Sequence, residues 1–282
     1  MSVELRASVN KVISAFNDGN FAYIREAGPD ILHTYSTDLK RYEEVADVLD
    51  ELLFIFDACE LKDESYTVSA LIGALPKPFV LPPGDTHFEI FTSNGKYQET
   101  QRQAAYNYIE KWGVALDIGG HVGFWANDLA TRFEIVHSFE PNPETFKCLM
   151  QNKSDNVSAY RFGVGDAFGS KFLSFPDGSG TTEPANSGGW EIADGKNEGT
   201  YCIEIKPLDS LSLEPDFIKI DVQGYELQVL LGARETIMRH RPVIMVELVA
   251  NGVIHREALD FIENNLGMVC KDVVNKDYVF GW

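Results

Sequence analysis

The chain has 282 residues and a mass of 31.5 kDa, enough for one large domain or two. Its 24 Lys and Arg residues against 43 Asp and Glu residues give a formal net charge of −19. Such a surface repels phosphate backbones and anionic lipid heads, so we expect neither a nucleic acid nor a membrane as partner. No apolar run approaches the roughly 20 residues of a membrane span, and the N-terminus lacks the apolar core of a signal peptide. We therefore expect a cytoplasmic protein.

The four cysteines are widely scattered, and no C-x-x-C pair occurs: Cys59, Cys148, Cys202 and Cys270. Neither a disulfide framework nor a zinc cluster is expected from this spacing. No other motif predicts a metal site.

The first part of the chain has helical patterning. Between residues 42 and 56, apolar side chains recur at the i, i+3, i+4, i+7 spacing of an amphipathic helix. Prolines between residues 76 and 83 then predict a linker, because they cannot continue a helix. We divide the chain into a helical N-terminal region, residues 1–85, and a ligand-binding domain, residues 86–282. The N-terminal region has no assigned role and could mediate oligomerisation.

From residue 114 the pattern alternates strand with helix, after a short strand at 87–92 and a helix at 97–112. Strands are expected at 114–118, 135–139, 157–164, 217–222 and 243–246. Helices are expected from 124, at 144–151, at 225–239 and at 255–265. Two closing strands at 268–274 and 278–282 are joined by a tight turn. This order predicts an α/β fold, with a mostly parallel seven-stranded sheet, helices on both faces and an antiparallel C-terminal strand.

One segment, residues 177–199, departs from this alternation. It is rich in Gly, Ser, Thr and Asn, and its aromatic residue is Trp190. Polar loops of this length inside compact domains are usually functional or disordered. We expect this loop to contact a substrate.

The first strand of the alternating part ends in a glycine-rich turn. Its sequence is Asp117-Ile118-Gly119-Gly120-His121-Val122-Gly123. The glycines allow a sharp turn and close approach of the backbone to a ligand. A nicotinamide fingerprint needs glycine at the position of His121. The acidic residue two positions before Gly119 suits a ligand with an ammonium group, as in S-adenosylmethionine.

Acidic residues follow the next two strands. Glu140 lies 23 residues after Asp117, where a carboxylate usually accepts from both ribose hydroxyls. The alternative is a helix-start charge favoured by the helix dipole. Gly165 and Asp166 close the third predicted strand and could seat an adenine. Because the carboxyl ends of parallel strands meet at one crevice, these residues predict one ligand site.

The fourth predicted strand contains Lys219 and Asp221, whose side chains point the same way. A buried charge must be paired, so we expect a neighbouring carboxylate to neutralise Lys219. Asp221 is expected to face the crevice, and Glu247 ends the fifth strand at an equivalent position. Two such carboxylates could share the general-base and orienting roles.

Four motifs together resemble the FkbM family of methyltransferases: residues 117–123, Phe139-Glu140-Pro141-Asn142-Pro143, residues 218–226 and Val246-Glu247. The resemblance runs from about Tyr97 to the C-terminus, and the motif at 218–226 is its most specific element. It implies a class I methyltransferase fold and methyl transfer from S-adenosylmethionine to an oxygen, often a hydroxyl of a sugar or natural product. Two residues depart from the family pattern, because His121 replaces a usual Asn and Gln223 a usual Glu.

The resemblance also implies roles for individual residues. Asp117, Gly119 and Gly123 would line the methionine end of the cofactor, Glu140 its ribose and Asp166 its adenine. The whole cofactor set is Asp117, Gly119, Gly120, His121, Gly123, Glu140, Pro141, Asn142, Gly165, Asp166 and Asp221. The acceptor side is assigned to Tyr97, Gln98, Trp190 and Glu226.

The sequence thus predicts an S-adenosylmethionine-dependent O-methyltransferase acting on a carbohydrate hydroxyl or a related small molecule. Asp221 is the expected base, with Glu247 or His121 as alternates. A second hypothesis is a non-catalytic module that binds the cofactor without turnover, which Gln223 keeps open. A third is a nicotinamide-dependent dehydrogenase, which His121 disfavours.

Overall fold

The structure is a computed structural model that describes residues 66–72, 75–83, 85, 97–174, 187–193, 201–248 and 253–282. The chain divides into two compact units, Met1–Glu64 and Ser65–Trp282, and all described residues belong to the second unit. The helix expected at 42–56 and the strand expected at 87–92 lie outside the described residues.

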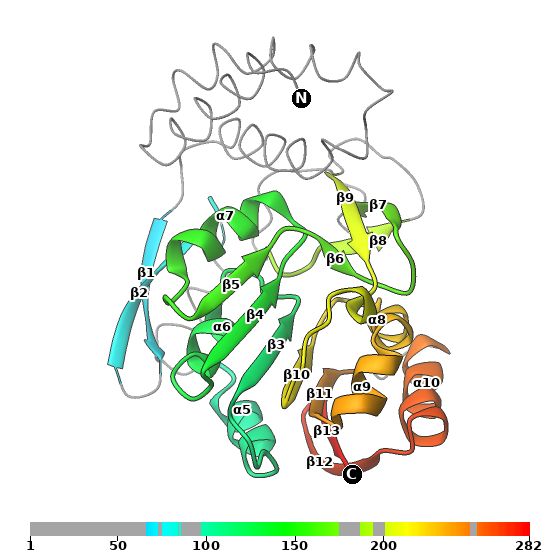
Figure 1. Cartoon of the computed structure of the whole chain (residues 1–282). Coiled ribbons are helices and arrows are strands. Elements are labelled where there is room, and N and C mark those ends of the chain that lie inside the picture. The colour runs from blue at the N-terminus through cyan, green and yellow to red at the C-terminus, as the bar shows by residue number, and fades with distance from the viewer. Residues whose placement is uncertain are drawn as a thin grey trace, which may run out of the picture. The chain divides into compact units, whose positions relative to one another are not determined.

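A seven-stranded sheet forms the centre of the second unit, in the order β12-β13-β11-β10-β3-β4-β5 (Figure 1). Its strands are β3 (Val114–Ile118), β4 (Ile135–Phe139), β5 (Val157–Tyr160), β10 (Phe217–Ile220), β11 (Val243–Glu247), β12 (Val269–Val274) and β13 (Asp277–Gly281). Neighbouring strands from β11 to β5 are parallel, whereas β13 runs antiparallel to β11 and β12. The predicted mostly parallel sheet with an antiparallel C-terminal strand is confirmed.

Helices follow the strands along the chain, as the alternating pattern predicts. They are α5 (Glu99–Tyr106), α6 (Phe124–Leu129), α7 (Pro143–Asn152), α8 (Glu226–Gly232), α9 (Arg234–His240) and α10 (Val253–Asp260), the last continuing into a π-helical turn, Phe261–Asn265. Pro143 stands in the first turn of α7, and the Asn142 side chain caps this helix by accepting from the Glu144 amide at 2.9 Å.

The single helix expected over 225–239 is instead two helices, α8 and α9. The Asp209 carboxylate accepts from the backbone amides of Glu235 and Thr236 at 3.1 and 2.8 Å. A side-chain acceptor at this point satisfies amides that a continuous helix would use itself. Because Asp209 lies 26 residues away from Glu235, local periodicity could not predict the break.

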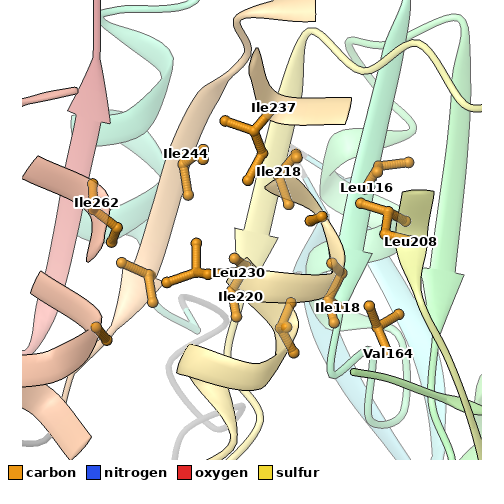
Figure 2. Close-up of a cluster of buried hydrophobic side chains, with 14 of the residues drawn as sticks. Leu116, Ile118, Val164, Leu208, Ile218, Ile220, Leu230, Ile237, Ile244 and Ile262 are labelled. Atoms are coloured by element: carbon orange, nitrogen blue, oxygen red, sulfur yellow. The ribbon is translucent and has the colours of Figure 1, made fainter. Parts of the chain in front are cut away.

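The main core lies between the sheet and helices α8 to α10 (Figure 2). Its fully buried side chains come from β3, β10, β11 and the covering helices and include Leu116, Ile218, Ile220, Leu230, Ile237, Ile244 and Ile262. Branched aliphatic side chains suit a strand that is buried on both faces. Close packing of this kind fixes the strand ends relative to one another, and these ends carry the predicted site.

A second sheet has four strands in the order β6-β9-β7-β8. They are β6 (Gly163–Val164), β7 (Gly169–Ser174), β8 (Glu191–Ala193) and β9 (Tyr201–Lys206). The expected third strand, 157–164, is therefore wrong in its second half: β5 ends at Tyr160, and Gly163–Val164 pairs with β9. Apolar residues continue through both strands, so their pattern does not show where the chain changes sheets.

Residues 66–81 form a hairpin, β1 (Tyr66–Ile72) and β2 (Leu75–Leu81), instead of the helix and linker expected there. A two-stranded hairpin tolerates Pro76 and Pro78, because the missing N–H groups can face an outer edge. Asn152 of α7 holds β2: its Oδ1 accepts from the Val80 amide at 2.7 Å, and its Nδ2 donates to the Val80 carbonyl at 2.9 Å.

Candidate functional site

A cavity of about 770 Å³ opens at the carboxyl ends of β3, β4, β10 and β11. This volume lies within the usual range for small-molecule and cofactor sites. The predicted site residues that line it are Tyr97, Gln98, Gly119, Gly120, His121, Glu140, Pro141, Asn142, Trp190, Asp221 and Glu247. The structure therefore brings most of the predicted cofactor, acceptor and base residues to one crevice, as expected for an open α/β sheet.

Five predicted site residues do not line this cavity: Asp117, Gly123, Gly165, Asp166 and Glu226. Asp117 is fully buried beneath it, and Gly123 is the N-cap of α6. Gly165 is buried, whereas Asp166 is exposed. The Glu226 carboxylate accepts from the amides of Val222 and Gly224 at 3.3 and 3.0 Å, so it supports the turn after β10.

The glycine-rich turn requires glycine at its first position. Gly119 has a φ of +83°, and a Cβ there would lie 1.8 Å from the Asp221 carbonyl oxygen. The Gly119 and Gly120 amides both donate to the Phe139 carbonyl at 3.0 Å. The turn is thus fixed against both β4 and the end of β10, with its backbone exposed to the cavity.

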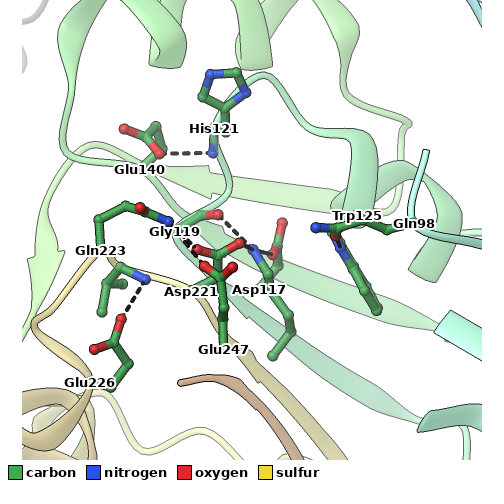
Figure 3. Close-up of polar contacts among 12 residues, drawn as sticks. Gln98, Asp117, Gly119, His121, Trp125, Glu140, Asp221, Gln223, Glu226 and Glu247 are labelled. Atoms are coloured by element: carbon green, nitrogen blue, oxygen red, sulfur yellow. Dashed lines mark hydrogen bonds and ion pairs between the residues drawn. The ribbon is translucent and has the colours of Figure 1, made fainter. Parts of the chain in front are cut away.

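Glu140 is buried at the end of β4 and faces this turn (Figure 3). Its Oε2 accepts from the His121 amide at 2.7 Å and its Oε1 from the Asn142 amide at 2.9 Å. Burial raises the pKa of Glu140, and these backbone hydrogen bonds oppose the rise. The Thr145 hydroxyl is a third partner, and because a carboxylate offers about four acceptor positions, the group can still accept from a ligand hydroxyl.

Lys219 lines the cavity, although it was not among the site residues predicted from the sequence. Its Nζ donates to the Gly119 carbonyl at 2.9 Å and lies 3.5 Å from Asp117 Oδ1 and 3.4 Å from Asp221 Oδ2. The predicted neutralisation of Lys219 by carboxylates is confirmed. Burial works against its charge, but Asp221 and Asp117 outweigh burial and raise the pKa of Lys219. The ammonium group therefore joins the glycine-rich turn to the carboxylates of the site.

Asp221 and Glu247 form a carboxyl pair bridged by Gln223. The Gln223 Nε2 donates to Asp221 Oδ1 at 2.8 Å and to Glu247 Oε2 at 3.1 Å (Figure 3). Both amide hydrogens are thereby used, which a carboxylate at this position could not reproduce.

The two carboxyl groups of this pair titrate differently. Burial and the neighbouring Asp221 charge raise the pKa of Glu247 to about 8. Burial also disfavours the charge on Asp221, but Lys219 and the hydrogen bonds from Glu247 and Gln223 outweigh it and lower the pKa of Asp221. A base role for Asp221 required a raised pKa, and within this pair only Glu247 has one.

Tyr97 and Gln98, both predicted from the sequence, also line the cavity. Burial, and then the charges of Asp221, Glu247 and Asp277, raise the pKa of the Tyr97 hydroxyl well above its usual value. Tyr97 is therefore a neutral hydroxyl at any ordinary pH. Gln98 begins α5, and its Oε1 accepts from Trp125 Nε1 at 2.5 Å.

The segment 187–193 of the predicted substrate loop forms another wall of the cavity. Ser187, Gly188, Trp190 and Ile192 line it. Trp190 is only 7% exposed, and its ring centroid lies 5.2 Å from that of Tyr201. Ser187 bonds to two distant residues: its Oγ lies 2.6 Å from His121 Nε2, and its Oγ and amide both bond to Asp85.

Within the described ranges, no group of three or more His, Cys, Asp and Glu side chains is arranged to hold a metal ion. None of the helices described here is long and apolar enough to cross a membrane.

The sheet order, the antiparallel β13 and a ligand cavity at the strand ends define a class I methyltransferase fold. Residues 117–268 match the model of the FkbM methyltransferase domain, and this match spans more than half of the chain. The chain belongs to the FkbM methyltransferase family, as the sequence motifs predict.

A curated relative is the hexuronic acid methyltransferase AglP of Haloferax volcanii, which is 30% identical over 130 residues. This alignment covers 44% of the chain and 51% of the relative, so the chain spans about half of the length of that protein.

Two solved structures are similar at low identity. An FkbM methyltransferase from Methylobacillus flagellatus KT has 16% identity and a TM-score of 0.43, covering 84% of this chain and 60% of that one. A precorrin-6y C5,15-methyltransferase from Geobacter metallireducens GS-15 has 16% identity and a TM-score of 0.39, covering 66% and 88%.

Proposed function

We propose that the protein transfers a methyl group from S-adenosylmethionine to a hydroxyl of a carbohydrate or a related small molecule. One observation carries the proposal: the glycine-rich turn, the prepared carboxylate of Glu140 and the Asp221–Glu247 pair line the same cavity. In this proposal the cavity has a half for the cofactor and a neighbouring half that accepts the proton. The relative named for hexuronic acid methylation supports a carbohydrate as the acceptor class.

The residues present fit this cofactor. A Cβ at position 119 would meet the Asp221 carbonyl oxygen, so glycine lets the turn pack closely against the end of β10, where both line the cavity. Glu140 is oriented by two amides and can accept from ribose hydroxyls. Glu140, the turn and Asp221 would hold the cofactor, which when bound supplies an activated methyl group.

We assign to Glu247 the role of general base, which accepts the proton of the acceptor hydroxyl. A general base works best when its pKa is close to the operating pH, and the pKa of Glu247 is raised to about 8. Asp221 keeps its charge beside Lys219, and this charge maintains the proton affinity of Glu247. In this proposal Asp221, the base expected from the sequence, orients Glu247 and the acceptor. His121 is engaged with Ser187, which favours a positioning role for it.

Tyr97, Gln98 and Trp190 are proposed to shape the acceptor side, where a carbohydrate needs hydrogen-bonding groups and an aromatic surface. Glu226 is assigned a supporting role at the turn after β10, because its carboxylate already accepts two backbone amides. Asp166 is exposed, and we propose that it contacts the adenine of the cofactor. A structure with bound cofactor would test this contact.

Methyl transfer from labelled S-adenosylmethionine to a panel of neutral sugars and hexuronic acids tests the function. We expect turnover to rise with pH through about 8, because Glu247 must be ionised to accept a proton. Asp221→Asn should move this midpoint to lower pH, since the charge that raises the pKa of Glu247 is removed. Glu247→Gln should lower the turnover rate by about 10²–10⁴ with little change in cofactor affinity.

Two results would count against the proposal. Cofactor binding without any methylated product would favour the non-catalytic module. Wild-type turnover in Glu247→Gln would remove Glu247 as the base.

A further inference from the structure

A chain of hydrogen bonds joins three segments that lie far apart in the sequence. His121 Nε2 lies 2.6 Å from Ser187 Oγ, and the Ser187 hydroxyl in turn bonds to Asp85 Oδ2. The Ser187 amide also donates to Asp85 Oδ2 at 3.2 Å. Both Asp85 and Ser187 are buried, at 0% and 4% exposure, so water does not compete strongly for these groups.

The direction of each hydrogen bond between these three side chains follows from the groups involved. A carboxylate only accepts, so the single Ser187 hydroxyl hydrogen is given to Asp85. The Ser187 oxygen must then accept from His121, which places a hydrogen on His121 Nε2. This arrangement makes His121 Nε2 a donor to the cavity wall.

His121 also touches the cofactor half of the cavity through its backbone. Its amide donates to Glu140 Oε2 at 2.7 Å, and it follows directly after Gly119 and Gly120. Its φ of +50° lies in the left-handed region, which residues other than glycine rarely adopt. One residue therefore connects the glycine-rich turn and the proposed ribose carboxylate to the wall formed by residues 187–190.

We propose that His121 is a positioning residue that fastens residues 187–190 to the glycine-rich turn and thereby slows release of the cofactor. The inference rests on the proposed function, because the cofactor is the ligand retained. The hydrogen bond to Ser187 Oγ needs a donor atom as far from the backbone as Nε2 of the imidazole ring. An Asn at this position ends one bond nearer the backbone and does not reach Ser187, whereas a Gln carries an amide donor at a similar reach.

The test uses full-length protein and labelled S-adenosylhomocysteine, whose dissociation is followed after chasing with unlabelled ligand. His121→Asn and Ser187→Ala should each release the ligand about tenfold faster, as the loss of one buried hydrogen bond predicts. His121→Gln should release it within about threefold of wild type, because a donor is restored. The matched control is His240→Asn, at the end of α9 and outside the cavity lining, which should leave the rate unchanged.

His121→Asn is a suitable test variant because Asn tolerates the left-handed conformation observed here. Amide hydrogen exchange over residues 187–193 of the unliganded protein provides a second readout: exchange should be faster in His121→Asn and normal in His121→Gln. Wild-type protein that binds no S-adenosylhomocysteine would overturn the proposed function. Normal binding with unchanged release from His121→Asn and Ser187→Ala would overturn only this inference.

Discussion

Replacing Glu247 by Gln should remove a pH dependence of stability that the carboxyl pair imposes on the protein. In the folded state the pKa of Glu247 is raised from 4.5 to about 8 by burial and by Asp221. Between these values the folded protein holds a proton that the unfolded chain releases. Its stability must therefore fall as pH rises through this window, because the unfolded state binds fewer protons.

The size of the effect follows from the same linkage. One proton per molecule corresponds to about 1.4 kcal/mol per pH unit, so the loss between pH 6 and pH 8 is at most about 3 kcal/mol. Water in the cavity screens part of this charge, and we expect about 2 kcal/mol. The pKa of Asp277 is raised to about 6, so its own contribution lies mostly below this interval. Gln resembles the protonated carboxyl, because it offers one donor group and one acceptor.

Urea unfolding at a series of pH values between 6 and 8 measures this difference. Wild type should lose stability relative to Glu247→Gln across the interval, and the difference should go on shrinking below pH 6, toward the unfolded pKa of 4.5. Glu257→Gln, on the exposed side of α10, is a matched control and should follow the wild-type curve. Parallel curves for wild type and Glu247→Gln would show that Glu247 does not carry the proton, and the base assignment would fail with it.

Three further changes test other parts of the site. Glu140→Ala should weaken S-adenosylmethionine binding more than about tenfold, because hydrogen bonds to a charged group contribute about 1.5–3 kcal/mol. Calorimetry measures this affinity, and the exposed control Glu134→Ala should leave it unchanged. Gly119→Ala should lower the melting temperature far more than Gly224→Ala. Both glycines have a positive φ, but only a Cβ at position 119 would meet a backbone oxygen, at 1.8 Å. Gln223→Glu should steepen the loss of stability between pH 6 and 8, because a third carboxyl replaces the bridging amide; an unchanged slope would contradict the bridge.

The sequence predicts those parts of the fold that local physics determines. The strands 114–118 and 135–139 are observed with the expected bounds, because each is a short run stopped by glycine or by an acidic residue and proline. The end of β5 and the break between α8 and α9 were missed. Both depend on partners far along the chain, the strand β9 and the Asp209 carboxylate.

The candidate site was likewise predicted in part from the sequence. Asp221 and Glu247 were expected at one crevice because parallel strands end at one edge of a sheet, and they are found there. Which of them carries a proton was beyond sequence reasoning, since the answer depends on the distances from Asp221 to Lys219 and to Gln223. A signal was nevertheless present: a lysine inside an apolar strand must find carboxylates, and the nearest in the sequence was Asp221.

The two departures from the family pattern acquire a physical meaning only in the folded chain. Gln223 replaces a carboxyl with an amide that donates to both members of the Asp221–Glu247 pair, so its loss of charge is matched by two hydrogen bonds. His121 replaces a shorter side chain and thereby reaches Ser187, which lies 66 residues away. Gln223 adds donors between two carboxyl groups, and His121 carries a donor far enough to reach the Ser187 oxygen. Both departures are therefore compatible with a site whose polar groups are paired, because other segments of the chain supply the partners of His121 and Gln223.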